Sequence, residues 1–307
     1  MAQENPGDAL HWPATHIHPQ SQLLQLVKSR DLEALTTYFS YSFPQLPDFL
    51  KAEYTVSHAV QLDHSRPGAL LLAATQAESP EIFEFLWDTL YALQEAVSIP
   101  KEPMQIPFSC LIQAARSGNI PLARAFVACE PSALSRGPPP SVHGLASGSQ
   151  IASALRTRHY EYLDFMRSQG VGLDDGWPDR RLLRMAAALE QTDEELEGMM
   201  RWLVARDVRI KGAGAVRFLA RCGTVESVRV LLDAGADVED LDDAREEKER
   251  SGDEVIESAL MGAVREGNVD MVGFLVKRGA NAGWKNNKGE TPLSVADQGE
   301  MMLFLSS

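Results

Sequence analysis

The chain has 307 residues, of which 44% are hydrophobic, and a formal net charge of −14. This length and hydrophobic content are sufficient for an extensive buried core. The acidic balance argues against binding to the phosphate backbone of nucleic acids and against binding to anionic membrane surfaces, because both require a basic face. No apolar run approaches the length of a membrane span.

The N-terminal segment and the cysteines bear on cellular location. Residues 1–19 have neither a basic start nor an apolar centre, so we expect a polar, mobile tail and no signal peptide. Cys110, Cys129 and Cys222 are odd in number and lack the spacing of a disulfide or metal motif. Such usage suits a reducing compartment, and we expect the protein to be intracellular, either cytoplasmic or nuclear.

Pairs of short helices are predicted along the first two thirds of the chain. They span residues 21–39, 69–86, 109–128, 149–173 and 182–208, and several keep an alanine at one position of the first helix. Proline-rich stretches at 97–108 and 135–144 cannot be helix interior, so we interpret them as stiff loops that widen the spacing between pairs.

The pattern becomes regular in the last hundred residues. Residues 214–238 give a helix, a Cys-Gly turn, a second helix with three consecutive branched apolar residues, and then "GAD". Residues 258–282, "SALMGAVREGNVDMVGFLVKRGANA", have the same layout. The segment "NNKGETPLSVA" at 286–296 begins it once more. Gly289 allows a sharp turn before Thr291 as N-cap and Pro292 at the first helical position.

These segments resemble the ankyrin repeat, whose signature is T-P-L-H-x-A at a period of 33 residues. "GETPLSVA" departs from it only at Ser294, and Ser258 stands 33 residues before Thr291. The resemblance implies an all-α, ankyrin-type helical solenoid of about seven to eight helix-turn-helix units with loop insertions. It predicts one repeat domain over 20–307, degenerate in 20–208 and clearer in 209–307. The alternative is an unrelated all-α domain built of amphipathic helices. The equivalent first-helix positions are Leu26, Ala73, Ala114, Ala154, Ala186, Leu219, Ala263 and Ala296.

An acidic insertion is predicted at residues 239–254. Residues 237–254 hold ten acidic and three basic side chains, and the repeat spacing there widens to 44. We interpret the insertion as an extended finger loop between repeats. A solvated loop and a contact for a basic partner are both compatible with it.

Motifs for catalysis or for a cofactor are missing from the sequence, so we predict no catalytic residue, no metal and no cofactor. His11, His16 and His18 lie in the polar tail without cysteine or carboxylate at ligand spacing. His159 and Cys222 fall in inter-helix turns. We interpret His159 as a structural residue and Cys222 as a surface thiol. An enzyme that uses the groove as a pocket for acid–base chemistry, of isomerase, cyclase or hydrolase type, remains the alternative. It would draw on His58, His64 and His143.

In proteins of this resemblance, finger tips and first helices line a concave face that holds partners. We therefore predict a non-catalytic scaffold that binds a protein partner, possibly one with a basic surface, and neither nucleic acid nor membrane. Tryptophan and arginine often anchor such faces. Trp177 and Trp284 occupy finger positions, where they either contact the partner or pack between fingers, while Trp87 and Trp202 lie in second helices and are predicted core. The predicted contact residues are Trp177, Asp179, Arg221, Arg265, Glu266, Trp284, Lys285, Asn287, Lys288 and Glu290; Asn286 is expected to project beside them.

Overall fold

The computed structural model describes residues 19–42, 66–96, 104–136, 150–174, 182–189, 192–206, 208–239 and 257–296. Within these ranges every regular element is helical, with fifteen α-helices and one 3-10 helix. None of these helices is both long and apolar enough to cross a membrane. The chain divides into two compact units, residues 1–171 and residues 172–307. Whether residues 20–307 act as one domain stays a prediction.

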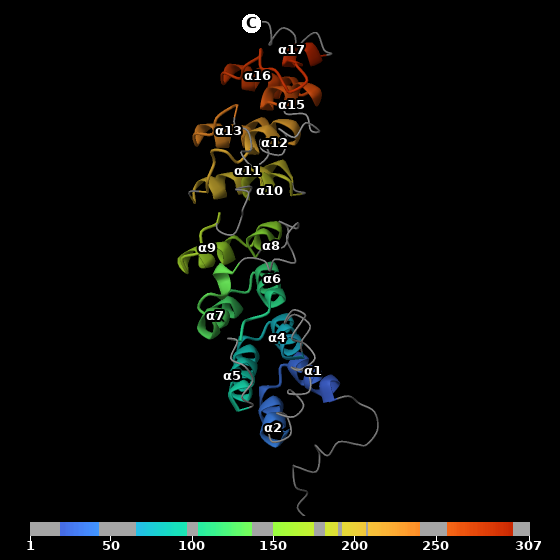
Figure 1. The fold of residues 1–307 in the computed structure, drawn as a ribbon, viewed down its shortest axis with the longest axis vertical. Helices are drawn as coiled ribbons and strands as arrows, with labels where there is room; N and C mark the ends of the chain where they lie inside the picture. Colours follow the sequence, from blue (N-terminus) through green and yellow to red (C-terminus); the bar gives the residue numbers. More distant parts are fainter. Residues whose placement is uncertain are drawn as a thin grey trace, which may run out of the picture. The chain divides into compact units, whose positions relative to one another are not determined.

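The first unit is a stack of four helix pairs (Figure 1). The first helix of each pair contacts the first helix of the next, through α1, α4, α6 and α8, and the second helices α5, α7 and α9 contact one another in the same way. The elements are α1 (Pro19–Ser29), α2 (Leu32–Ser42), α4 (Arg66–Gln76), α5 (Pro80–Ala96), α6 (Phe108–Ser117), α7 (Ile120–Cys129), η3 (Ala133–Ser135), α8 (Gln150–Arg156) and α9 (Tyr160–Ser168).

The second unit repeats this two-layer arrangement with three pairs and the start of a further one. First helices α10, α12, α15 and α17 contact in series, as do second helices α11, α13 and α16. Their bounds are α10 (Leu182–Ala187), α11 (Asp193–Val204), α12 (Ala215–Cys222), α13 (Val225–Asp233), α15 (Ala259–Arg265), α16 (Val269–Lys277) and α17 (Pro292–Val295). The predicted all-α array of about seven to eight helix-turn-helix units is confirmed.

The predicted first-helix positions form the layer between pairs. Six of the eight are buried, namely Ala73, Ala114, Ala154, Ala186, Leu219 and Ala263. Small side chains there let neighbouring helices approach closely, and Leu, Val and Met fill the remaining space. Trp87 is buried as predicted. Trp202 is not core: it is partly exposed, and the Arg206 guanidinium lies 3.9 Å from its ring centroid.

Helix starts follow the local sequence. The predicted caps are present, since Ser258 Oγ accepts the N–H of Met261 at 3.2 Å and Thr291 Oγ1 accepts the N–H of Ser294 at 3.1 Å. Pro292 is the first helical residue, where its missing N–H has no cost. Thr192 with Glu195 forms the capping box that opens α11.

Five of the turns inside the pairs contain a left-handed residue, whereas Gly223 in the α12–α13 turn is extended. In α6–α7 and α15–α16 this residue is glycine, Gly118 (φ 66°) and Gly267 (φ 71°). The corresponding turns of three irregular pairs hold Arg30 (φ 59°), Glu78 (φ 54°) and Arg158 (φ 61°). The backbone geometry of the repeat is therefore kept where its glycine has been lost, at a conformational cost to these three residues.

Candidate partner-binding face

One ion pair joins the C-terminal ends of two neighbouring first helices, α12 and α15, in the second unit. Arg221, in the last turn of α12, donates from Nη2 to Glu266 Oε1 of the next repeat at 3.3 Å. The approach is close because residue 262 is glycine: a Cβ there would lie 2.6 Å from Cγ of Arg221. The predicted contact residues Arg221 and Glu266 are therefore brought together by helix packing.

Arg265, the equivalent arginine one repeat later, bridges two carboxylates. Its Nε lies 2.5 Å from Oε1 of Glu257, and its Nη2 lies 2.7 Å from Oε2 of Glu290. Glu257 and Glu290 each directly precede an N-cap, of α15 and of α17. We call Arg221, Glu257, Arg265, Glu266 and Glu290 the charge ladder. Glu257 is absent from the sequence-based prediction.

The finger that precedes α17 is organised by Asn286. Its side chain is 5% exposed, and its Oδ1 accepts the N–H groups of Lys288 at 2.9 Å and Glu290 at 2.8 Å. Its Nδ2 donates to Oε2 of Glu290 at 2.8 Å. The expectation that Asn286 projects is wrong, because an asparagine that satisfies the turn's backbone donors must fold inward.

The other predicted finger residues differ in exposure. Lys285, Asn287 and Lys288 are exposed around the Asn286 turn, whereas Trp284 is partly buried. Trp177 and Asp179 lie outside the described residues. The accessible part of the predicted face thus consists of Arg221, Arg265, Glu266 and Glu290 of the charge ladder together with Lys285, Asn287 and Lys288.

Electrostatics at the finger favour an ionised Glu290. The hydrogen bond from Asn286 is the largest cause and lowers the pKa of its carboxyl; desolvation, the next largest, opposes it, and the charges of Arg265 and Lys288 lower the pKa further. Cys222, exposed at the end of α12, behaves differently: burial of the thiol is the largest cause and raises its pKa. It is therefore a surface thiol without thiolate activation.

Two further sequence candidates can be placed. His159 is partly buried and lies against Gly118 of the preceding pair, consistent with a packing role. The histidines of the enzyme alternative, His58, His64 and His143, fall outside the described residues, as do His11, His16 and His18.

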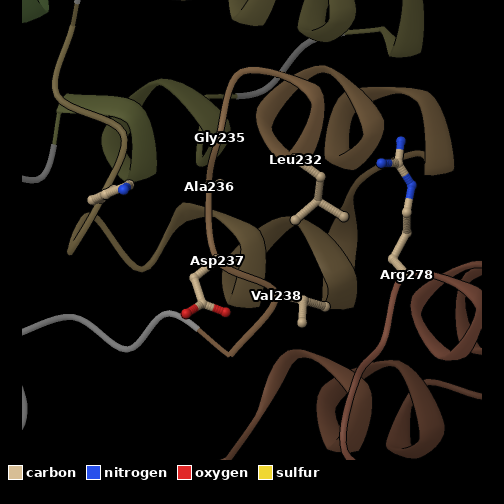
Figure 2. A pocket seen from close by; sticks show the side chains of 7 residues that line it. Leu232, Gly235, Ala236, Asp237, Val238 and Arg278 are labelled. Carbon is tan, nitrogen blue, oxygen red and sulfur yellow. The ribbon is translucent and has the colours of Figure 1, made fainter.

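One open pocket lies in the second unit, near the fingers (Figure 2). It has a volume of about 550 Å³ and is lined by Lys211, Leu232, Gly235, Ala236, Asp237, Val238 and Arg278. Arg278 forms an ion pair with Asp233, and its guanidinium lies 5.2 Å from the ring centroid of Phe274. None of the residues that line this pocket belongs to the charge ladder.

Stacked helical hairpins, with fingers between them, define the class as a helical repeat protein. A family model described as "Ankyrin repeat" matches residues 257–287, which span α15, α16 and the start of the following finger. Residues 257–287 are therefore similar to an ankyrin repeat, and the other described helix pairs are stacked in the same two layers.

Two similar solved structures are also ankyrin repeat domains. That of Bcl-3, titled a unique member of the IkappaB protein family, is 16% identical over 93% of this chain and 97% of that chain, with a TM-score of 0.36. That of human ASB11 is 16% identical over 94% of this chain and 97% of that chain, with a TM-score of 0.29. No curated protein sequence matches this chain.

Proposed function

We propose that this chain is a non-catalytic scaffold that binds a protein partner inside the cell through the charge ladder and residues 284–290. The observation that carries the proposal is that ion pairs of the ladder connect successive repeats. Arg221, Arg265, Glu266 and Glu290, predicted separately as contact residues, form ion pairs across successive repeats on one side of the first helices.

The energetics of these pairs suit recognition. Exposed ion pairs contribute little to folding, typically below about 1 kcal/mol, so they are not needed to hold the repeats together. They do hold long side chains in fixed positions, which lowers the entropy lost when a partner binds. Charged groups arranged this way favour correct partners and steer association.

The partner's chemistry follows from charge. A chain with a net charge of −14 attracts a basic surface and repels polyanions. Exposed carboxylates of the ladder would pair with the partner's basic side chains, while Lys285 and Lys288 set orientation at the finger. We therefore propose that the partner is a protein, and not a nucleic acid or a membrane lipid.

The test compares charge reversals on and off the face. The tagged wild-type chain, Glu266→Lys and the control Asp270→Lys are cross-linked in cells of the source organism, and captured proteins are quantified by mass spectrometry. Asp270 and Lys277 lie exposed in the first and last turns of α16, within the same repeat. Circular dichroism checks that each variant folds.

We expect the capture of one or more proteins, equal for the wild type and Asp270→Lys, to fall at least tenfold with Glu266→Lys. Binding of the purified pair should then weaken as salt rises. Equal capture by all three chains, with Glu266→Lys fully folded, would contradict the assignment of this face.

A further inference from the structure

Neighbouring fingers in the second unit are joined by carboxylates. Oδ2 of Asp174 accepts the backbone N–H of Arg209 at 2.7 Å, and Oε1 of Glu239 accepts the backbone N–H of Asn281 at 2.7 Å. In each joint an acid in one finger accepts from the main chain of the next finger. Glu239, predicted as the first residue of the acidic insertion, is therefore a finger residue.

Both joints occupy the same register. The four second helices α9, α11, α13 and α16 each have a buried residue near the end, at Met166, Leu203, Leu231 and Leu275. The bridging acid follows eight residues after that position, in Asp174 and in Glu239. The donating N–H follows six residues after it in the next repeat, at Arg209 and at Asn281.

The joint between these two has lost its acid. Eight residues after Leu203 stands Lys211, and six after Leu231 stands Asp237. A lysine cannot accept the N–H of Asp237, and that N–H donates to no acceptor in the described part of the chain. Although their side chains carry opposite charges, no ion pair joins Lys211 to Asp237 within the described ranges; Oδ1 of Asp237 accepts the N–H of Glu239 at 3.0 Å.

The open pocket of about 550 Å³ lies at this middle joint. Figure 2 shows the finger from Gly235 to Val238, which lines the pocket, with the side chains of Asp237 and Val238 on the finger and that of Leu232 on α13. The carbonyl of Lys211 accepts from Nε of Arg209 at 3.1 Å. The pocket therefore combines an ammonium group, an unbonded N–H and an apolar wall.

We propose that this pocket binds a carboxylate from outside the chain, in the place of the missing bridging acid. The ammonium of Lys211 and the N–H of Asp237 would hold its oxygens, as the N–H groups of Arg209 and Asn281 hold Asp174 and Glu239. The ligand is an aspartate or glutamate side chain of a protein, whose stem and neighbours contact Leu232 and Val238. Only this choice of a protein source rests on the proposed function.

Local charge favours a single negative charge on the ligand. Asp233 pairs with Arg278, and the carboxylate of Asp237 lines the pocket. Lys211 is then the one lining cation without an ion pair in the described residues. A dianionic phosphate would meet repulsion from Asp237 that one cation does not offset.

The site is tested on the full chain without any partner. Sodium acetate is added to the protein in steps, with sodium chloride reduced to keep the ionic strength constant, and the amide chemical shifts are followed by 15N NMR. We expect the Asp237 amide proton to move downfield and to saturate. Lys211→Met should weaken the response at least tenfold, the matched control Lys277→Met should leave it unchanged, and Asp237→Asn, which keeps the N–H and removes the repelling charge, should strengthen it.

Two further arms identify the ligand. A capped peptide with one glutamate should bind more tightly than acetate, and inorganic phosphate more weakly. Peptide binding no tighter than acetate would overturn the protein source, and stronger phosphate binding would overturn the single-charge assignment. Because acetate needs no partner, these outcomes are independent of the charge ladder.

A last variant restores the acid. Lys211→Glu should bridge to the Asp237 N–H, raise Tm and abolish the acetate response. If Lys211→Glu folds and still responds to acetate, or if Asp237 in the wild type shifts no more than other exposed amides, the proposal is wrong.

Discussion

The imidazole of His159 lies against Gly118 of the preceding repeat, so closely that a Cβ on residue 118 would stand 2.4 Å from Cγ of His159. Residue 118 also has a left-handed backbone, with φ at 66°. We expect Gly118→Ala to destabilise the first unit by about 2 kcal/mol, from both causes. Thermal unfolding of Gly118→Ala, His159→Ala and the double variant separates them. If the loss is the same in the His159→Ala background, the contact has no part in it.

Replacing Arg158 by glycine should stabilise the first unit. It holds the left-handed position that Gly118 and Gly267 hold in regular repeats, with φ at 61°. Removing its Cβ relieves a conformational cost of about 1–2 kcal/mol, partly offset by the greater freedom of glycine in the unfolded chain. Arg158→Gly should therefore raise Tm. Arg156→Gly, at the last residue of α8, should lower it. A lower Tm for both would show that Arg158 is not strained.

Leu231 is expected to be a main stabilising residue of the second unit. It is fully buried in α13 and also anchors the following turn, since its carbonyl accepts the N–H of Ala236 at 3.0 Å. Leu231→Ala should cost about 2–5 kcal/mol of the free energy of unfolding, measured by urea denaturation. Leu232→Ala, next to it but only partly buried, should cost clearly less. An equal loss of the free energy of unfolding in both variants would contradict the assignment of Leu231 to the core and Leu232 to the pocket wall.

Local signals allowed much of this fold to be predicted from the sequence. Ser258 and Thr291 cap helices because each bonds an N–H three residues away, and Leu231 is buried because it lies on an apolar helical face. Contacts between repeats left no such signal. Glu257 meets Arg265, and Glu239 meets Asn281, only because helix pairs stack in a particular register. The side chain of Asn286 was wrongly predicted to project. The local sequence is the same whether a turn asparagine points into solvent or folds inward to bond the backbone N–H groups of the turn.

Asn286 should be the most sensitive polar residue of the last finger. Asn286→Ala leaves the N–H groups of Lys288 and Glu290 without their acceptor and removes a donor to the Glu290 carboxylate. We expect a loss of about 1–3 kcal/mol. Lys288→Ala, exposed in the same turn, should change stability by less than about 0.5 kcal/mol. Similar effects of the two substitutions would mean that the turn does not depend on Asn286.

Glu239 should make stability depend on pH. Burial is the largest cause that raises the pKa of its carboxyl, with Asp237 adding to it and the Asn281 N–H opposing it, and its Oε2 is buried without a hydrogen bond in the described structure. A raised folded pKa means that ionisation is less favourable in the folded state, so stability falls as pH rises from the unfolded value through the folded one.

Glu239→Gln keeps an acceptor for Asn281 and cannot ionise. It should therefore raise Tm at pH 7 and converge with the wild type below about pH 4, where the glutamate is protonated in both states. Calorimetry from pH 4 to pH 8 measures both profiles. A Tm difference that is independent of pH would show that ionisation of Glu239 is not its cause.

Hydrogen exchange of the second unit, with and without the captured partner, tests most directly whether the charge ladder and residues 284–290 bind a protein. We predict slower amide exchange in residues 284–290 and at the ends of α12 and α15, around Arg221 and Arg265, and no change along α11, α13 and α16. Protection confined to those second helices, with unchanged exchange at 284–290, would contradict the account.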